Sequence, residues 1–209
     1  MNASSKEAPQ AAAHPVRIGV LALQGDYDAH AQALRDVAAE PVLIRKPEQL
    51  ADLDGLIIPG GESTTFLKFL ERDGFLGSLA DFVRHKPTFG TCAGCILLAT
   101  EVTHPPQESL GVLNATVERN AYGRQIDSSI QTGDTKLPGG PLEMVYIRAP
   151  RIVKTGPGVQ VLAERDGFPV LVEQGHILAA TFHPELSQDR RVHQRFIDLV
   201  RSHTSQATR

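Results

Sequence analysis

The sequence predicts an α/β fold with a mostly parallel central sheet, flanking helices and an antiparallel β extension. Three observations predict it. In the first half of the chain, short apolar runs alternate with segments of helical spacing, which is typical of right-handed crossovers between parallel strands. Several of these apolar runs end in a Gly-bearing turn. In the second half, β-type runs follow one another between Gly, Pro and Asp, which favours antiparallel pairing.

The first half contains four apolar runs of the buried-strand type. These strands are expected over 16–23, 41–45, 54–61 and 87–91. Segments with helical spacing lie between and after them, so helices are expected over 27–40, 63–71, 75–85 and 93–100. In the first of these helices the apolar stripe consists of Ala29, Ala33, Leu34, Val37 and Ala38.

The second half is expected to be mainly β structure with one final helix. The β-type runs span 111–120, 143–150, 159–167, 169–175 and 176–185. Asp166-Gly167 and Gln174-Gly175 are plausible hairpin turns. The Gly/Pro-rich segment 131–141 is expected to be a surface loop, and a helix should run from about Asp189 to Arg201. One domain is expected over 16–202, with a disordered tail over 1–15 and a C-terminal tail over 203–209.

Composition narrows the functional classes. The chain has 209 residues, of which 41% are hydrophobic and 22% charged, so it can bury a substantial core. The formal charge of −3 gives no reason to expect nucleic acid or an anionic membrane as a partner. No apolar run approaches the roughly 20 residues of a membrane span, and the first residues lack a secretory signal. Two closely spaced cysteines suit a reducing, cytoplasmic location.

Residues 90–94 (GTCAG) have the spacing of a strand-to-helix elbow that exposes a nucleophile. Small neighbours allow the tight turn, the start of the following helix favours a Cys92 thiolate, and the amide of Ala93 can stabilise an oxyanion. One alternative is that the glycines only pack and Cys92 is a buried thiol. Another is that Cys92 and Cys95 form a redox dithiol or half a metal site, although a metal would need ligands that no second Cys pair supplies.

His183 and Glu185 are candidates for the base that a thiol nucleophile needs and for the group that orients this base. Because they are two residues apart, they share a face if the segment is extended. The alternative is a strand end that carries a solvated His and Glu.

The turn at 59–64 (PGGEST) can direct backbone amides toward a ligand, while Ser63 or Thr64 can cap the next helix. Its spacing is not that of a phosphate-binding loop that ends in Gly-Lys. Arg119 and Arg148 suit a carboxylate ligand, although single arginines are more often surface residues.

Together these motifs resemble the class I, triad-type glutamine amidotransferases, which have a flavodoxin-like fold. The resemblance is closer still to the glutaminase subunits of pyridoxal 5′-phosphate synthases, and it covers roughly residues 16–200. The matching runs are GVLALQGD (19–26), PGGEST (59–64), GTCAG (90–94), RNAYGRQ (119–125), IRAP (147–150) and FHPEL (182–186).

The resemblance implies hydrolysis of L-glutamine to L-glutamate and ammonia. It implies that Cys92 is the nucleophile, His183 the base and Glu185 its orienting partner, with no metal and no cofactor. The amides of Gly61 and Ala93 would be the oxyanion donors. The partner would be a separate (β/α)₈-barrel synthase subunit that receives the ammonia and activates the glutaminase on docking. The glutamine site would comprise Gly61, Glu62, Ser63, Arg119, Ile147 and Arg148.

Three features depart from the family pattern: the residue Cys95, the stretch 128–141 and the N-terminal tail. Family members usually carry an aliphatic residue at the position of Cys95. Cys95 lies one helical turn beyond Cys92 and is expected to be a small core residue. A disulfide between the two that switches the enzyme off is a further hypothesis. Other functions remain open: a glutaminase for histidine or purine synthesis, a thiol redox protein, or a regulatory subunit, which the complete triad disfavours.

Overall fold

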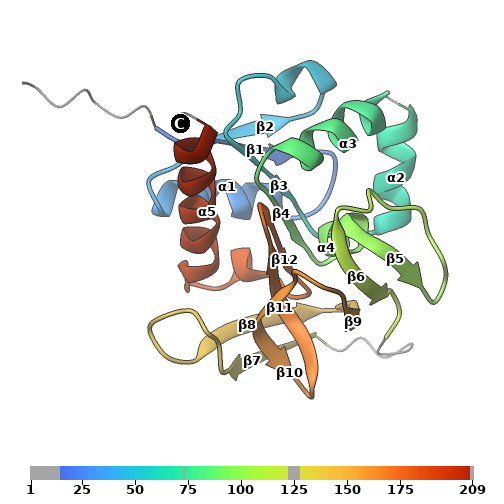
Figure 1. The fold of residues 1–209 in the computed structure, drawn as a ribbon, viewed down its shortest axis with the longest axis vertical. Helices are drawn as coiled ribbons and strands as arrows, with labels where there is room; N and C mark the ends of the chain where they lie inside the picture. Colours follow the sequence, from blue (N-terminus) through green and yellow to red (C-terminus); the bar gives the residue numbers. More distant parts are fainter. Residues whose placement is uncertain (1–14, 73, 122–127, 208–209) are drawn as a thin grey trace, which may run out of the picture.

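A computed structural model of the chain describes residues 15–72, 74–121 and 128–207. Nearly all of the expected N-terminal tail therefore lies outside the described residues. A seven-stranded sheet with the order β10-β11-β12-β4-β3-β1-β2 forms the centre (Figure 1). Five neighbouring strands are parallel, and they are β1 (Arg17–Leu21), β2 (Glu40–Ile44), β3 (Gly55–Ile58), β4 (Thr88–Thr91) and β12 (Ile177–Ala180).

Helices cover both faces of this sheet, each over its own hydrophobic cluster. On one face lie α1 (Tyr27–Asp36) and α5 (Arg191–Ala207), whose Leu34 and Phe196 are fully buried. The other face is covered by α2 (Ser63–Arg72), α3 (Phe75–His85) and α4 (Ala93–Leu98). The α/β class and the mostly parallel sheet expected from the sequence are thus confirmed.

The antiparallel extension is also present, but it is divided among sheets. In the central sheet, β10 (Gln160–Arg165) and β11 (Phe168–Gln174) pair antiparallel next to β12. The turn at Asp166-Gly167 is confirmed, whereas the second turn is Gly175-His176, one residue later than expected. A separate sheet contains β5 (Ala99–Thr103), β6 (Leu113–Glu118) and β9 (Arg151–Thr155), in which β9 pairs antiparallel with β6 whereas β5 pairs parallel with it. A hairpin pairs β7 (Ser128–Gly133) antiparallel with β8 (Leu142–Ile147).

Helix ends differ most from expectation. The helix expected over 27–40 ends at Asp36, and Ala38 is exposed with a positive φ of 57° because the chain reverses there to enter β2. The helix expected over 93–100 ends at Leu98, since residue 99 already pairs with β6. At the other end of the chain, α5 continues to Ala207, so residues 203–207 are helical where a tail was expected.

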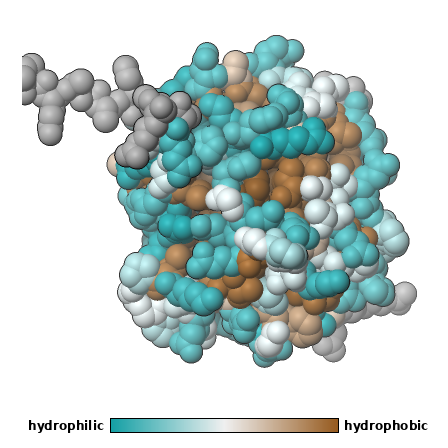
Figure 2. All heavy atoms as spheres, in the orientation of Figure 1, coloured by the Kyte–Doolittle hydropathy of each residue, from teal (hydrophilic) through white to brown (hydrophobic). Residues whose placement is uncertain are grey.

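The segment 131–141 is only partly the surface loop that its composition suggested. Residues 131–133 belong to β7, which pairs with β8 through six residues, and Leu137 is buried. The described helices include none long and apolar enough to cross a membrane. On the face seen in Figure 2, hydrophilic residues cover most of the surface and apolar residues show between them.

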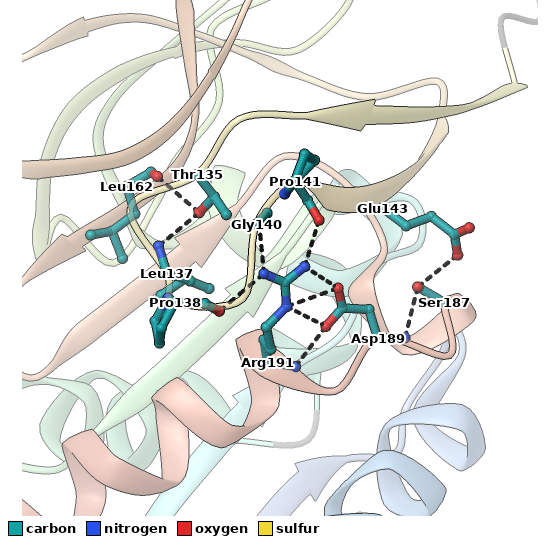
Figure 3. Close-up of polar contacts among 10 residues, drawn as sticks. All are labelled: Thr135, Leu137, Pro138, Gly140, Pro141, Glu143, Leu162, Ser187, Asp189 and Arg191. Atoms are coloured by element: carbon teal, nitrogen blue, oxygen red, sulfur yellow. Dashed lines mark hydrogen bonds and ion pairs between the residues drawn. The ribbon is translucent and has the colours of Figure 1, made fainter.

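Arg191, at the start of α5, fastens residues 138–141 to the helix (Figure 3). Its guanidinium donates to the carbonyl oxygens of Pro138 (3.1 Å), Gly140 (2.8 Å) and Pro141 (2.6 Å). It also pairs with Asp189 at 2.6 Å. A guanidinium can serve all these acceptors together because it presents five donors in a rigid plane.

We expect Arg191→Met to lower the free energy of unfolding by about 1–3 kcal/mol, because hydrogen bonds from a charged donor to the loop carbonyls are lost. Urea denaturation of the purified chain measures this. Arg201→Met is the matched control: Arg201 makes an exposed ion pair with Asp198 at 3.9 Å, so its loss should change stability by about 0.5 kcal/mol or less. Equal effects of the two substitutions would show that the loop is not held by Arg191.

Candidate active site

A pocket of about 230 Å³ contains most of the residues that the sequence analysis singled out. It lies where the central parallel strands end, as the rule for ligand sites in parallel sheets predicts. Its lining residues are Gly25, Asp26, Gly61, Glu62, Ser63, Cys92, Ile96, Arg119, Asn120, Ile147, Arg148 and His183. Larger hollows of about 450, 510 and 720 Å³ lie elsewhere on the described surface, but none of the three is lined by a cysteine, and only the first is lined by a histidine, the exposed His85.

Cys92 occupies the strained turn between β4 and α4. Its φ of 48° and ψ of −104° are unfavourable for a residue with a side chain, and such strain is common at functional sites. The backbone N–H of Cys92 donates to the carbonyl of Ala180 on β12 at 2.9 Å, which fixes the end of the strand. Cys92 is 6% exposed and lines the pocket. This is the elbow that the sequence predicts.

Glycine at position 94 is required by close packing of α4 against β3. A Cβ atom there would lie 2.1 Å from the carbonyl oxygen of Ile58, and the backbone cannot yield as a flexible side chain can. At Gly90 a Cβ would lie 2.6 Å from the backbone of Gly94. The small residues of the motif therefore allow the elbow to sit directly on the sheet.

We expect Gly94→Ala to lower the free energy of unfolding by about 1–3 kcal/mol, because the backbone must shift to admit the methyl group. Gly77→Ala in α3 is the control. Nothing lies within 4 Å of a Cβ there, so alanine should raise stability by about 0.5–1 kcal/mol. Thermal unfolding of both variants measures the contrast, and an equally stable Gly94→Ala protein would contradict the packing argument.

His183 and Glu185 form a buried pair beside the nucleophile. Nδ1 of His183 lies 2.7 Å from Oε1 of Glu185, and both residues are 4% exposed. In place of the extended segment that was expected, Pro184–Leu186 forms one turn of 3₁₀ helix, which brings the carboxylate back toward the imidazole. The burial contradicts the alternative of a solvated His and Glu.

The charges in this pair favour an imidazolium. Burial lowers the pKa of His183, but its hydrogen bonds with Cys92 and Glu185 outweigh this and raise the pKa to about 10. Burial raises the pKa of Glu185, yet the neighbouring His30 and His183 hold it below its usual value. Cys92 and His183 both pack against Gly60, where a Cβ would lie 3.3 Å from the Cys92 Cβ and 2.5 Å from the His183 ring. The three side chains therefore form a contiguous row.

Glu62 caps the helix that follows the Gly-Gly turn. Its carboxylate accepts hydrogen bonds from the backbone N–H groups of Thr64 (3.1 Å) and Thr65 (2.7 Å) and from both threonine hydroxyls. Burial raises the pKa of Glu62, but the hydrogen bonds from Thr64 and Thr65 outweigh this effect and lower the pKa to about 2. Ser63, which the sequence analysis considered as a cap, instead donates to Gln107 at 2.7 Å.

Arg119 extends over the pocket toward Glu62. Its Nη2 lies 3.3 Å from Oε1 of Glu62, its side chain is 11% exposed, and its buried Nε has no acceptor among the described residues. Arg148, which also lines the pocket, has a positive φ of 43°. Of the 119–125 motif, residues 122–125 lie outside the described residues.

Gly61 and Ala93, whose backbone amides are the expected oxyanion donors, lie on different sides of Cys92 in the chain: Gly61 in the turn after β3, and Ala93 at the start of α4. Gly61 lines the pocket with a φ of 131° and packs against Gln24, whose amide donates to the Glu62 carbonyl at 2.7 Å. Ala93 is fully buried directly after Cys92. Their roles as donors stay predictions.

Cys95 is a core residue, as expected. It is fully buried in the cluster beneath α2, α3 and α4, and burial raises the pKa of its thiol to about 12. Both cysteines are free thiols. A thiol this resistant to ionisation is a poor partner in disulfide exchange, which weakens the redox alternative.

Sequence reasoning missed several polar residues at the site. Asp26 lines the pocket, and a carboxylate oxygen of it lies within 4.8 Å of ligand atoms of His183 and Glu185. His30 and His193 are fully buried behind Glu185. A signal for His30 was present, because it falls beside Ala33 and Leu34 on the buried face of its helix.

Comparison with known proteins gives consistent matches. The model of the SNO glutamine amidotransferase family matches residues 20–202. The pyridoxal 5′-phosphate synthase subunit PdxT of Koribacter versatilis is 60% identical over 190 residues, covering 91% of this chain and 98% of the relative. PdxT of Thermotoga maritima is 47% identical, covering 89% and 100%.

Solved structures agree with these matches. A crystal structure of a glutamine amidotransferase has a TM-score of 0.81 at 45% identity, covering 88% of this chain and 98% of its own. A putative GMP synthase protein from Thermoplasma acidophilum shares the fold alone, with a TM-score of 0.72 at 17% identity, covering 94% of this chain and 99% of its own.

Proposed function

We propose a function for this chain, which belongs to the SNO glutamine amidotransferase family: it is the glutaminase subunit of a pyridoxal 5′-phosphate synthase. It hydrolyses L-glutamine to L-glutamate and ammonia in vitamin B6 biosynthesis. The observation that supports this most is the contiguous row of Cys92, His183 and Glu185: Cys92 and His183 line one pocket and both pack against Gly60, and His183 lies 2.7 Å from Glu185.

The geometry supports a covalent mechanism. The Cys92 thiolate attacks the side-chain amide carbon of glutamine, and the amides of Gly61 and Ala93 stabilise the tetrahedral oxyanion. His183 carries a proton on the side of its ring that faces Cys92 and donates it to the amide nitrogen, which departs as ammonia. A γ-glutamyl thioester then remains on Cys92. His183 then takes a proton from water as the water attacks the thioester, and glutamate leaves. Glu185 keeps Nδ1 of His183 protonated throughout.

Arg119 suits the α-carboxylate of glutamine. Its Nε is buried and without an acceptor among the described residues, so a carboxylate at this point would satisfy it. Glu62, ionised beside it, suits the α-amino group. Ser63, Ile147 and the strained Arg148 complete the walls of the proposed glutamine site.

We expect Arg119→Met to raise KM for glutamine about 10-fold or more while kcat stays within about threefold, because a charge-assisted hydrogen bond to the substrate is lost. Steady-state assays of glutamate release measure both constants. Arg45→Met, a change at an exposed arginine outside the pocket, is the control and should leave KM unchanged. A fall in kcat at constant KM would place Arg119 in transition-state stabilisation instead.

The proposed partner is a (β/α)₈-barrel synthase subunit that receives the ammonia, in the cytoplasm. The names of the relatives, which are synthase subunits, support the partnership. The free thiols support a reducing compartment. The net charge of −3 gives no support to nucleic acid or an anionic membrane as a partner.

The test is glutamate release from glutamine with and without the synthase subunit of the same organism. We expect turnover that depends on the synthase, together with formation of pyridoxal 5′-phosphate. Glutamine turnover that feeds a histidine or purine enzyme instead would favour the other glutaminase alternatives. No turnover under either condition would overturn the proposal.

A further inference from the structure

A row of buried polar groups continues behind Glu185. Nε2 of His30 lies 3.3 Å from Oε2 of Glu185 and 3.1 Å from the hydroxyl of Thr91, the residue before the nucleophile. Nδ1 of His30 lies 3.1 Å from Nε2 of His193. Both histidines are fully buried, one on α1 and the other on α5. The glutaminase mechanism above uses neither of them.

The surroundings of these histidines keep them uncharged. Burial is the main cause that lowers the pKa of His30, and it helps to lower the pKa of His193 to about 3. Phe89 packs edge-on against both rings, with centroid distances of 6.2 and 5.9 Å. Each ring therefore carries a single N–H, and its position decides which contacts are hydrogen bonds.

Only one placement of these protons gives each N–H an acceptor. Oε2 of the ionised Glu185 can only accept, so the proton of His30 belongs on Nε2. Nδ1 of His30 then accepts from Nε2–H of His193. The opposite placement would bury an N–H on Nδ1 of His193, which has no partner among the described residues, and would set a lone pair of His30 against the carboxylate.

We propose that His30 is a positioning residue for the triad, holding Glu185 by donating from Nε2 to Oε2 so that Oε1 stays directed at His183. This rests on the proposed function of Cys92, His183 and Glu185. Oε2 makes no hydrogen bond of standard geometry with any described residue, and Nε2 of His30, 3.3 Å away and also 3.1 Å from the Thr91 hydroxyl, is placed to donate to it. Through Thr91, the same imidazole also joins Glu185 to the strand that carries Cys92.

Two amide variants separate positioning from simple packing. The side-chain amide of glutamine reaches about as far as Nε2 of histidine, whereas that of asparagine reaches only as far as Nδ1. We expect His30→Asn and His30→Leu to lower kcat about 10- to 100-fold with KM within about twofold, as loss of an orienting partner does elsewhere. His30→Gln should stay within about fivefold of the wild-type kcat. Glutamate release in the reconstituted complex measures these values, and melting temperatures are recorded alongside.

A double-mutant cycle tests whether His30 acts through Glu185. In a Glu185→Gln background, His30→Leu should change kcat by less than about threefold, because the carboxylate that it orients is gone. His176→Leu is the matched control, since this half-buried histidine bonds the Val83 carbonyl at 3.0 Å and does not line the pocket. It should leave kcat unchanged.

The outcomes are distinct. Equal losses in all three His30 variants that follow their melting temperatures, or full additivity with Glu185→Gln, would overturn the positioning role while the glutaminase assignment stands. A wild-type complex that releases no glutamate would overturn the proposed function and the role of His30 with it. Rescue by glutamine but not by asparagine, at similar melting temperatures, would support the proposal.

Discussion

Cys92→Ala is expected to reduce glutamine turnover by about 10⁴-fold or more, because without a thiolate no thioester forms and only binding and the oxyanion donors remain. The fold should be unaffected, since alanine fits a small, nearly buried site. Glutamate release in the presence of the synthase subunit measures the loss. Acid quenching of the wild type with labelled glutamine should trap label on Cys92, which peptide mass spectrometry can locate.

Cys95→Ala is the matched control. It removes the other thiol of the chain, three residues away and fully buried, and should leave kcat within about twofold because Cys95 does not line the pocket. Near-normal activity of Cys92→Ala would disprove the assignment of the nucleophile. Loss of activity in both variants would favour the interpretation that Cys92 and Cys95 act together as a redox pair.

Glu185→Gln is expected to lower kcat about 10³- to 10⁴-fold, as the equivalent change does in hydrolase triads. The amide can no longer fix the proton on Nδ1 of His183 or stabilise the imidazolium. Glutamate release measures kcat, and circular dichroism checks that the variant folds.

The same variant should shift the titration of His183. Its pKa of about 10 means that the imidazolium persists below that pH and is lost as the pH rises through it. Removing the carboxylate removes a cause that raises the pKa, so NMR should detect deprotonation at a lower pH in Glu185→Gln. A kcat near wild type, or an unchanged titration, would show that Glu185 is not the orienting group.

The sequence predicted the parts of the site that local pattern determines. The elbow around Cys92 needs small residues at fixed positions, and the structure shows why: a side chain at Gly94 would strike the backbone of β3. The turns that follow β1 at Gly25, β3 at Gly61 and β4 at Cys92 converge on one pocket, because parallel strands end at the same edge of a sheet. These constraints act within a few residues, so they can be read from a short stretch.

The rest depended on contacts between distant segments. The sequence of strand β7, SSIQTG, is polar except for Ile130 and its final glycine. The segment forms a strand because β8 pairs with it along its whole length. The cap of α2 comes from Glu62 rather than the more usual serine or threonine. The groups around His30 come from Thr91, Glu185 and His193, all of them 61 or more residues away in the chain, and no local pattern indicates them.

The pairing of β4 with β12 has a consequence for how this enzyme can change. Nucleophile and base follow the ends of two adjacent strands, held in register by Ala180↔Thr91 and by the Cys92 amide. The residues proposed to recognise glutamine come from other places: Glu62 before α2, Arg119 after β6 and Ile147 at the end of β8. The reacting groups thus follow strands of the central sheet, while the proposed recognition residues come from segments outside its strands. A library that varies only those segments should yield amidases for new substrates that keep the same reacting groups in place.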